Sequence, residues 1–188
     1  MRKLKKSMHS TGNFLLTKLI VILSSDFMWI VGVGYKDGYS DPMGRNTKSD
    51  ILQLSISKVK DVKALQTYVI DGEITREGAE RIGRELLADG VVQFFNFDRF
   101  DGDGKHVRSL DGRRNGWAIE VFFRPGVMDP VGLSVAKAIE VIGIRDVKSV
   151  RTGTTYIIDG KLDENEVKTI CEKCLANPLI QTYRYQRL

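Results

Sequence analysis

The most reactive residue types in this chain are two cysteines, Cys171 and Cys174, in the segment Cys-Glu-Lys-Cys. This spacing occurs in dithiol redox centres and in half of a zinc site. A zinc site needs a second pair of ligands, and the only histidines are His9 and His106. Both cysteines also fall on the apolar stripe of an expected helix. We therefore predict that they serve core packing.

Two acidic residues occupy positions where a catalytic carboxylate is conceivable. Asp41-Pro42 and Asp129-Pro130 each follow an apolar run that ends in a turn. An aspartate followed by proline is also typical of a helix start, because aspartate caps the free N–H groups and proline lacks an N–H at the first helical position. We predict helix caps rather than catalytic acids.

Three further motifs suggest ligand sites but do not meet the requirements for them. Asp101-Gly-Asp103-Gly104 resembles a calcium loop, yet a glycine at loop position six would put Arg99 at position one and Leu110 at position twelve. Gly32-Val-Gly34 followed by Gly38 lacks the spacing of a dinucleotide fingerprint. Arg151 and its counterpart Lys63 could contact an anion or face water, and charge frequency favours water.

The sequence segments that carry these residues occur twice in the chain. When the chain is compared with itself at an offset of 88 positions (117 minus 29), 21 of the 72 pairs from 29/117 to 100/188 are identical. Chance would give roughly four identities for ordinary composition. The offset also places Cys174 opposite Leu86 and Cys171 opposite Gly83, which favours packing over chemistry for the cysteines. Two copies are too few for a solenoid, so we predict a fused pair of homologous halves.

Each copy begins with a strand and a helix. In the second copy Ile119, Val121 and Phe123 alternate with Ala118, Glu120 and Phe122, which predicts a strand with one well-buried face. Glycines at 32 and 34 in the first copy suggest that another backbone comes close there. The helices are expected from the periodic apolar residues Val131, Val135, Ala138, Ile139 and Ile142 in one copy and Thr47, Ile51 and Leu54 in the other, with Gly143 closing the second copy's helix.

Each copy then continues with a long strand, a second helix and a last strand. The long strands are expected at 59–70 and 147–158, with a possible bend at Gly153, and they end at the turns Asp71-Gly72 and Asp159-Gly160. Asp163 and Glu166 have the spacing of a capping box. The buried stripe of the second helix is expected from the residues Val167, Ile170, Cys171, Cys174 and Leu175, with Ala79, Ile82, Leu86 and Leu87 in the first copy. The last strands are expected at 91–97 and 179–185.

Charge and composition favour a mixed surface over a nucleic-acid partner. The formal net charge is +5, and residues 1–28 carry +4 of it through Arg2, Lys3, Lys5, Lys6 and Lys18 against Asp26. The repeated body is left near neutral, with acids and bases mixed. An apolar run at 14–23 is too short to cross a membrane and lacks a clear cleavage site, so we expect a disordered extension or a mis-assigned start. A peripheral helix and a targeting segment are the alternatives. Both cysteines lie in one short segment, which favours a reducing, cytoplasmic location.

These patterns predict an α+β fold in which two β-α-β-α-β repeats form a pseudo-dimer with helices packed on antiparallel sheets. The expected organisation is an extension at 1–28, a first repeat at 29–97, a Gly/Asp-rich linker at 98–116 and a second repeat at 117–188.

The second repeat resembles the PurS-type small subunit of phosphoribosylformylglycinamidine synthase. The resemblance is carried by Gly126-Val-Met-Asp-Pro-Val-Gly132, Asp146-Val-Lys-Ser-Val-Arg-Thr-Gly153 and the segment from Cys171 to Tyr185. The first repeat is similar, with Asp37 in place of a proline and Gly90 in place of the proline of Asn-Pro. The tandem also resembles the N-terminal domain of the large single-chain synthases. The resemblance implies a fold related to the ferredoxin-like fold and a role in purine biosynthesis.

The resemblance further implies a non-catalytic subunit or domain that bridges a glutaminase and an ATP-dependent synthase and helps to organise ammonia transfer. ATP, magnesium and glutamine would be used by those partners, and this chain alone would be inactive. No catalytic, cofactor-binding or metal-binding residue is expected within it. The alternative is a ferredoxin-like regulatory module that binds an amino acid or nucleotide between its two halves. A nucleic-acid module is a distant third.

Overall fold

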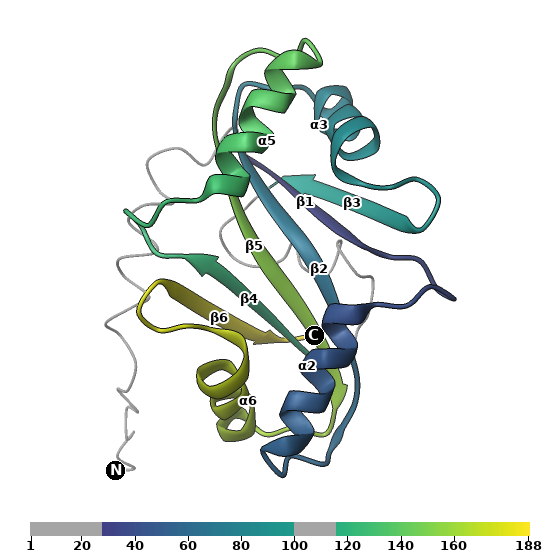
Figure 1. The fold of residues 1–188 in the computed structure, drawn as a ribbon, viewed down its shortest axis with the longest axis vertical. Helices are drawn as coiled ribbons and strands as arrows, with labels where there is room; N and C mark the ends of the chain where they lie inside the picture. The colour runs from purple at the N-terminus through teal and green to yellow at the C-terminus, as the bar shows by residue number, and fades with distance from the viewer. Residues whose placement is uncertain (1–27, 100–115) are drawn as a thin grey trace, which may run out of the picture.

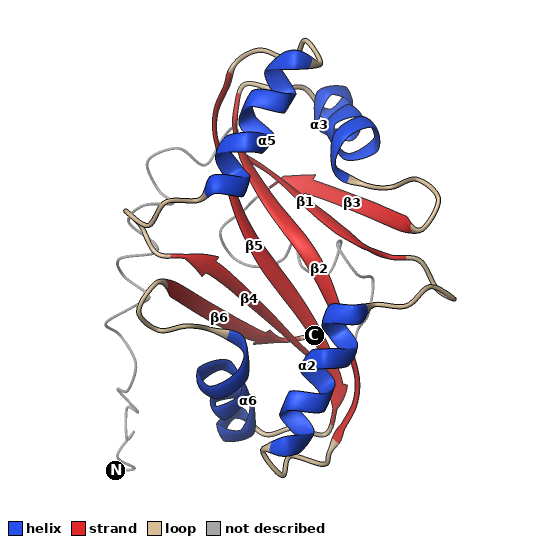
Figure 2. Ribbon diagram, viewed as in Figure 1, coloured by secondary structure: helices blue, strands red, loops and turns tan. Residues whose placement is uncertain are grey.

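The computed structural model describes residues 28–99 and 116–188, which fold into one six-stranded sheet with helices on one face (Figures 1 and 2). Most of the expected extension 1–28 and most of the linker 98–116 lie outside the described residues. The first half contains β1 (Met28–Tyr35), α2 (Pro42–Gln53), β2 (Val59–Gly72), α3 (Arg76–Ile82), the π-helix η2 (Gly83–Leu87) and β3 (Gln93–Arg99). The second half contains β4 (Trp117–Phe123), α5 (Pro130–Val141), β5 (Val147–Gly160), α6 (Glu164–Ile170), the π-helix η3 (Cys171–Leu175) and β6 (Gln181–Arg187).

The strand order β3-β1-β2-β5-β4-β6, with every pair antiparallel, confirms the α+β pseudo-dimer. The long strands β2 and β5 pair at the centre, where Gln66 lies opposite Thr154. These two residues are 88 positions apart (154 minus 66), so each faces its own counterpart and a pseudo-twofold axis passes between them. Next to them the hydroxyls of Thr67 and Thr155, another pair of counterparts, share a buried hydrogen bond of 2.7 Å.

The first helix of each half, α2 or α5, contributes to the core of the other half, whereas α3 and α6 pack on their own half. Ile51 from α2 lies in one apolar cluster with Trp117, Ile158 and Ile170 of the second half. Ile139 from α5 lies in the matching cluster of the first half. Figure 1 shows the result, with α2 beside α6 at one end of the sheet and α5 beside α3 at the other. Each core is therefore built from both halves.

A tryptophan in the first strand of each half forms a hydrogen bond to the turn before the second helix of that half. Trp29 Nε1 donates to the carbonyl of Ile74 at 3.0 Å, and Trp117 Nε1 donates to the carbonyl of Leu162 at 3.1 Å. Both indoles are buried, so these bonds satisfy polar groups that would otherwise be costly to bury.

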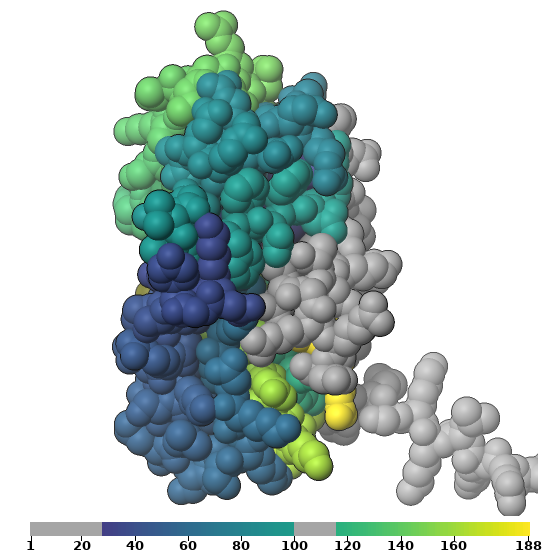
Figure 3. Space-filling model, turned by 90° about the vertical axis from the view of Figure 1, so that its right-hand side faces the viewer, coloured from purple at the N-terminus to yellow at the C-terminus, as the bar shows by residue number. Residues whose placement is uncertain are grey.

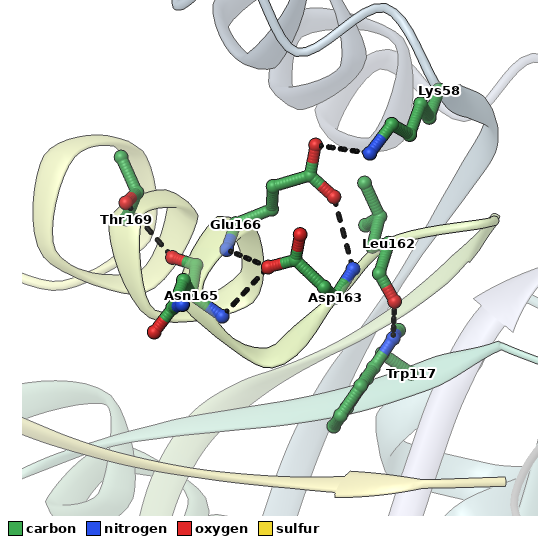
Figure 4. A network of polar contacts seen from close by, with 7 residues as sticks. All are labelled: Lys58, Trp117, Leu162, Asp163, Asn165, Glu166 and Thr169. Carbon is green, nitrogen blue, oxygen red and sulfur yellow. Dashed lines mark hydrogen bonds and ion pairs between the residues drawn. The ribbon is translucent and has the colours of Figure 1, made fainter.

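The predicted capping box of α6 is confirmed (Figure 4). Asp163 Oδ1 accepts from the backbone N–H of Asn165 at 2.9 Å and of Glu166 at 3.0 Å, and Glu166 Oε2 accepts from the N–H of Asp163 at 2.9 Å. The other oxygen of Glu166 lies 2.9 Å from Lys58 Nζ, which comes from the first half. This hydrogen bond and the charge of Glu166 raise the pKa of Lys58. The cap thus also links the two halves.

The prediction that β4 has only one well-buried face is wrong, because its other face is buried too. Ala118 and Glu120 are almost fully buried there. An apolar cluster on this side of the sheet includes Ile30, Leu65 and Ile157. Glu120 tolerates burial because Arg184 Nε lies 2.5 Å from its Oε2 in an ion pair, which offsets part of the cost of removing the charge from water.

The glycines at the centre of the sheet make room for neighbouring side chains. A Cβ added to Gly34 would lie 2.8 Å from Leu65 Cδ2 and 2.9 Å from Phe94 Cζ. In the second half the same pair is reversed, because Phe122 replaces Gly34 and Gly153 replaces Leu65. At Gly34 the space is therefore filled by side chains and not by another backbone, whereas a Cβ at Gly153 would also lie 2.5 Å from the carbonyl of Val121. The pairing of β5 with β2 continues through Gly153 without a register shift.

We expect Gly153→Leu to destabilise the protein by about 1–3 kcal/mol, because its new side chain would overlap the ring of Phe122. A Cβ at position 153 would lie 2.5 Å from Phe122 Cδ1. The double variant Phe122→Gly with Gly153→Leu reproduces the residue pair of the first half, so the two changes should couple favourably by at least about 1 kcal/mol. Recovery will be partial, since the carbonyl of Val121 is equally close. Chemical denaturation of the four proteins in the cycle measures this coupling, and simple additivity would contradict it.

The ends of the long strands and the starts of the last strands differ from the predicted positions. The Asp-Gly pairs at 71–72 and 159–160 are still paired within the central strands, so the turns begin only after them. The last strands begin at Gln93 and Gln181, two residues later than predicted. In the second half the cause is the Asn-Pro turn, where Asn177 Oδ1 accepts from the N–H of Leu179 and its carbonyl accepts from the N–H of Gln181. Leu179 therefore lies in a turn and not in the sheet.

Candidate functional site

Both predicted capping aspartates are confirmed as helix caps, and their carboxylates are fully engaged. Asp129 Oδ1 accepts from the N–H of Gly132 at 2.8 Å, while Oδ2 accepts from the N–H of Thr152 at 2.6 Å. Asp41 makes the equivalent bonds to Gly44 and Ala64, each at 2.8 Å. Each aspartate therefore ties the start of a long helix to a central strand. A carboxylate held in this way serves architecture rather than proton transfer.

The two cysteines lie in the second half's core, at the π-helix η3. Cys171 is fully buried and belongs to the apolar cluster that also contains Ile51 and Ile170. Burial, with a smaller contribution from Glu172, raises the pKa of the Cys171 thiol to about 12. Burial and the carboxylate of Asp50 also raise the pKa of Cys174. A reactive cysteine needs a lowered pKa, so this geometry favours packing over redox chemistry.

We expect Cys171 to resist alkylation by iodoacetamide in the folded protein. A pKa of about 12 leaves the thiolate fraction at pH 8 roughly a thousandfold below that of an ordinary cysteine. Because the pKa is raised, the reaction rate should keep increasing with pH well beyond pH 9. Mass spectrometry of the labelled protein measures this, with the urea-unfolded protein as the control in which both cysteines react. Rapid labelling of Cys171 at neutral pH would contradict the packing role.

The two basic residues on the long strands differ in their surroundings. Lys63 Nζ lies 3.0 Å from Asp37 Oδ1, so it is paired with a carboxylate. Arg151 is exposed, and its Nη2 lies 3.9 Å from the sulfur of Met28. The exposure of Arg151 agrees with the expectation that it faces water, whereas its counterpart Lys63 has a carboxylate partner.

No cluster of three or more potential metal ligands occurs within residues 28–99 and 116–188. The calcium-like segment Asp101–Gly104 and the two histidines lie outside the described residues. Within the ranges that the structure describes, none of the helices is both long and apolar enough to span a bilayer.

The second half presents a fixed pair of loops at the edge of the sheet. The side chain of Arg124, in the turn between β4 and α5, donates from Nε to the carbonyls of Pro178 at 3.1 Å and Gln181 at 3.0 Å. Its backbone N–H donates to the carbonyl of Ile180 at 2.9 Å. The turn before α5 and the turn before β6 are therefore held side by side.

Large apolar side chains are exposed on these two turns and along α5. Leu179 is 83% exposed, Met128 73% and Leu133 58%. We define the α5 surface as these residues and their exposed apolar neighbours on the same elements: Met128, Val131, Leu133, Val141, Leu179 and Ile180. Val131 was expected in the buried stripe, yet it is half exposed. An exposed apolar surface of this kind is typical of a protein interaction site.

The first half carries a more polar surface at the same positions. The counterparts of Met128, Leu133 and Val141 are Ser40, Arg45 and Gln53. Only the counterparts of Val131, Leu179 and Ile180 stay apolar, as Met43, Val91 and Val92. Both halves share one backbone plan, so the fold alone does not require the apolar residues of α5. Helical periodicity could not reveal this surface, because periodic apolar residues such as Val131 were assigned to the buried face of the helix.

Comparison with known proteins gives two matches of one family model to the chain. The model is the PurS model described as phosphoribosylformylglycinamidine (FGAM) synthase, and it matches residues 29–100 and 117–188. The chain is similar to the phosphoribosylformylglycinamidine synthase subunit PurS of Archaeoglobus fulgidus, with 37% identity over 70 residues that cover 35% of this chain and 88% of the relative. It is also similar to the PurS subunits of Methanocaldococcus jannaschii, at 35% identity over 32% of this chain and 78% of the relative, and of Bacillus subtilis, at 32% identity over 36% and 86%.

Proposed function

The chain belongs to the PurS family of phosphoribosylformylglycinamidine synthase subunits, as a tandem of two PurS-like units in purine biosynthesis, and we propose that it acts as a non-catalytic assembly subunit or domain of that synthase. In this role it bridges the glutaminase and the ATP-dependent synthase and helps ammonia to pass between them. ATP, magnesium and glutamine are used by those components and not by this chain. The site of action is the cytoplasm.

The observation that carries this proposal is the α5 surface. It exposes six apolar side chains, and three of these six positions carry polar residues in the first half. A partner could bind to this surface without disturbing the core. The residues that could do chemistry support the same role, since Asp41 and Asp129 cap helices and Cys171 is buried with a raised pKa.

The junction between the halves offers little support for the alternative regulatory module. There β2 and β5 pair directly with each other on the two sides of the axis, and the hydroxyls of Thr67 and Thr155 share a hydrogen bond. A ligand between the halves would have to displace this pairing.

Reconstitution of the synthase tests the proposal. Glutamine-dependent FGAM synthesis is measured with the glutaminase and synthase components, with and without this chain. We expect activity only when the chain is present, while the chain alone neither hydrolyses glutamine nor consumes ATP. Equal activity without it would refute the assembly role. Activity with free ammonia in place of glutamine serves as the control for an intact synthase.

A further inference from the structure

The two turns at the edge of the sheet are held together in both halves, but by different residues. In the second half Arg124 Nε donates to the carbonyls of Pro178 and Gln181 at 3.1 and 3.0 Å. In the first half its counterpart Lys36 donates from Nζ to two carbonyls of the loop before β3, at 2.6 and 3.2 Å. Figure 3 looks onto the first half's contact, where the turn after β1 and this loop lie next to each other at the surface. Holding the two turns therefore does not require an arginine.

Arg124 uses one of its five N–H groups for this contact. The four N–H groups on its two Nη atoms have no acceptor within residues 28–99 and 116–188. Lys36, by contrast, already uses two of its three N–H groups. Because Arg124 is exposed, the second half presents a guanidinium that is anchored through Nε and keeps four charged donors for another molecule.

Arg124 lies at the α5 surface. Its own turn carries Met128, and the turn that it contacts carries Leu179 and Ile180. The backbone N–H of Arg124 also donates to the carbonyl of Ile180 at 2.9 Å, which keeps the cation beside these apolar side chains. A partner that covers them would also remove the Nη groups from water. Buried N–H groups without acceptors are costly, above all on a cation, so the partner has to supply acceptors there.

The acidic residues nearest along the chain do not neutralise Arg124. Asp129 is engaged as a helix cap, with bonds to the N–H groups of Gly132 and Thr152. Glu140 lies near the other end of α5, about 15 Å from Pro130 along the helix axis. An uncompensated cation beside an apolar surface disfavours purely apolar partners and favours one with a negative group at the matching place. Arginine binds a carboxylate through two parallel hydrogen bonds.

We propose that Arg124 recognises a carboxylate on the component of the synthase that binds the α5 surface. This inference rests on the assembly role and adds the chemistry of the partner, which is an apolar surface with an aspartate or glutamate opposite the Nη groups of Arg124. The first half does not offer the same site, because it has Lys36 at this position and the polar residues Ser40 and Arg45 close to it in sequence. The carboxylate would therefore also fix the orientation of the partner, by distinguishing the second half from the first.

Arg124→Lys tests the proposal, because lysine holds the same two turns in the first half. The concentration of the chain that gives half-maximal glutamine-dependent FGAM synthesis is measured in the reconstituted enzyme. We expect Arg124→Lys to raise this concentration at least about tenfold, since lysine keeps the charge but not the planar fork. The melting temperature of the variant should stay within about 2 °C of the wild type. Lys36→Arg in the first half is the matched control and should leave the half-maximal concentration within about twofold.

Salt dependence tests the charge of the partner group. Arg124→Gln keeps an amide donor for the two carbonyls but removes the positive charge. Raising the ionic strength from about 0.05 M to about 0.3 M should weaken assembly of the wild-type chain several-fold more than assembly of Arg124→Gln, because salt screens ion pairs. Activity with free ammonia at each salt concentration corrects for effects of salt on the synthase itself.

Two results would overturn this inference while leaving the assembly role intact. One is an unchanged half-maximal concentration for Arg124→Lys. The other is equal salt dependence of the wild-type and Arg124→Gln chains, which would mean that the partner supplies neutral acceptors. Synthase activity that does not depend on the wild-type chain would overturn the assembly role and this inference with it. Because that result is obtained before any variant is added, the two failures are distinguished.

Discussion

Residues 116–188 expressed alone should not fold as a monomer. Their core would lack Ile51, Val59 and Val62, which the first half inserts beside Ile170. Burial of such side chains is worth roughly 1.5–3 kcal/mol each, against a total stability of about 5–15 kcal/mol for an ordinary domain. The strand β5 would also lose its long partner β2 and expose an unpaired edge. We expect an unfolded chain at low concentration and a homodimer at high concentration.

Circular dichroism and analytical ultracentrifugation of the isolated half over a range of concentrations measure this behaviour. Mixing it with the separately expressed residues 28–99 is the control, since the two pieces should restore a one-to-one complex with the stability of a cooperative fold. A monomeric second half that unfolds cooperatively would show that the exchanged helices are dispensable.

Charged residues on the α5 surface should uncouple the chain from the synthase without unfolding it. We expect the double variant Leu133→Lys with Leu179→Lys to reduce glutamine-dependent activity in the reconstituted enzyme at least about tenfold, because charges in an apolar interface lose contacts and are costly to desolvate. Both side chains are exposed, so the free energy of unfolding should change by less than about 0.5 kcal/mol.

Val91→Lys is the matched control for this variant. Val91 is the counterpart of Leu179 in the first half and is 71% exposed. It should leave activity unchanged, because the first half has the polar residues Ser40, Arg45 and Gln53 in place of Met128, Leu133 and Val141. Full activity of the double variant would exclude the α5 surface as the contact, even if omission of the chain still abolishes activity.

The sequence predicted those features that depend on local chemistry. Aspartate before proline predicted the caps at Asp41 and Asp129, and the spacing of Asp163 and Glu166 predicted the capping box. Gly143 has the left-handed φ of +83° expected at the end of α5. The offset of 88 residues predicted the pseudo-dimer, because two identical plans in one chain can pair in the way that two subunits do.

The sequence could not predict which half each helix would cover. Periodicity identifies the buried face of α2, but Ile51 would look the same whether it packed on its own strands or on those of the second half. Alternation likewise suggested solvent for Glu120, whose burial depends on Arg184 from a distant strand. The α5 surface was missed for a related reason, since an exposed Val131 cannot be told from a buried one by spacing.

The residues on the pseudo-twofold axis have an evolutionary consequence. In a homodimer, a residue on the axis meets a copy of itself, so one gene position must suit both sides and any mutation enters twice. In this chain Gln66 faces Thr154, and Gln66 Nε2 donates to the carbonyl of Gly153 at 3.2 Å. Fusion has separated the two positions, so each can mutate to complement the other. In tandem relatives, positions 66 and 154 are therefore expected to covary, a signal that single-copy relatives cannot encode.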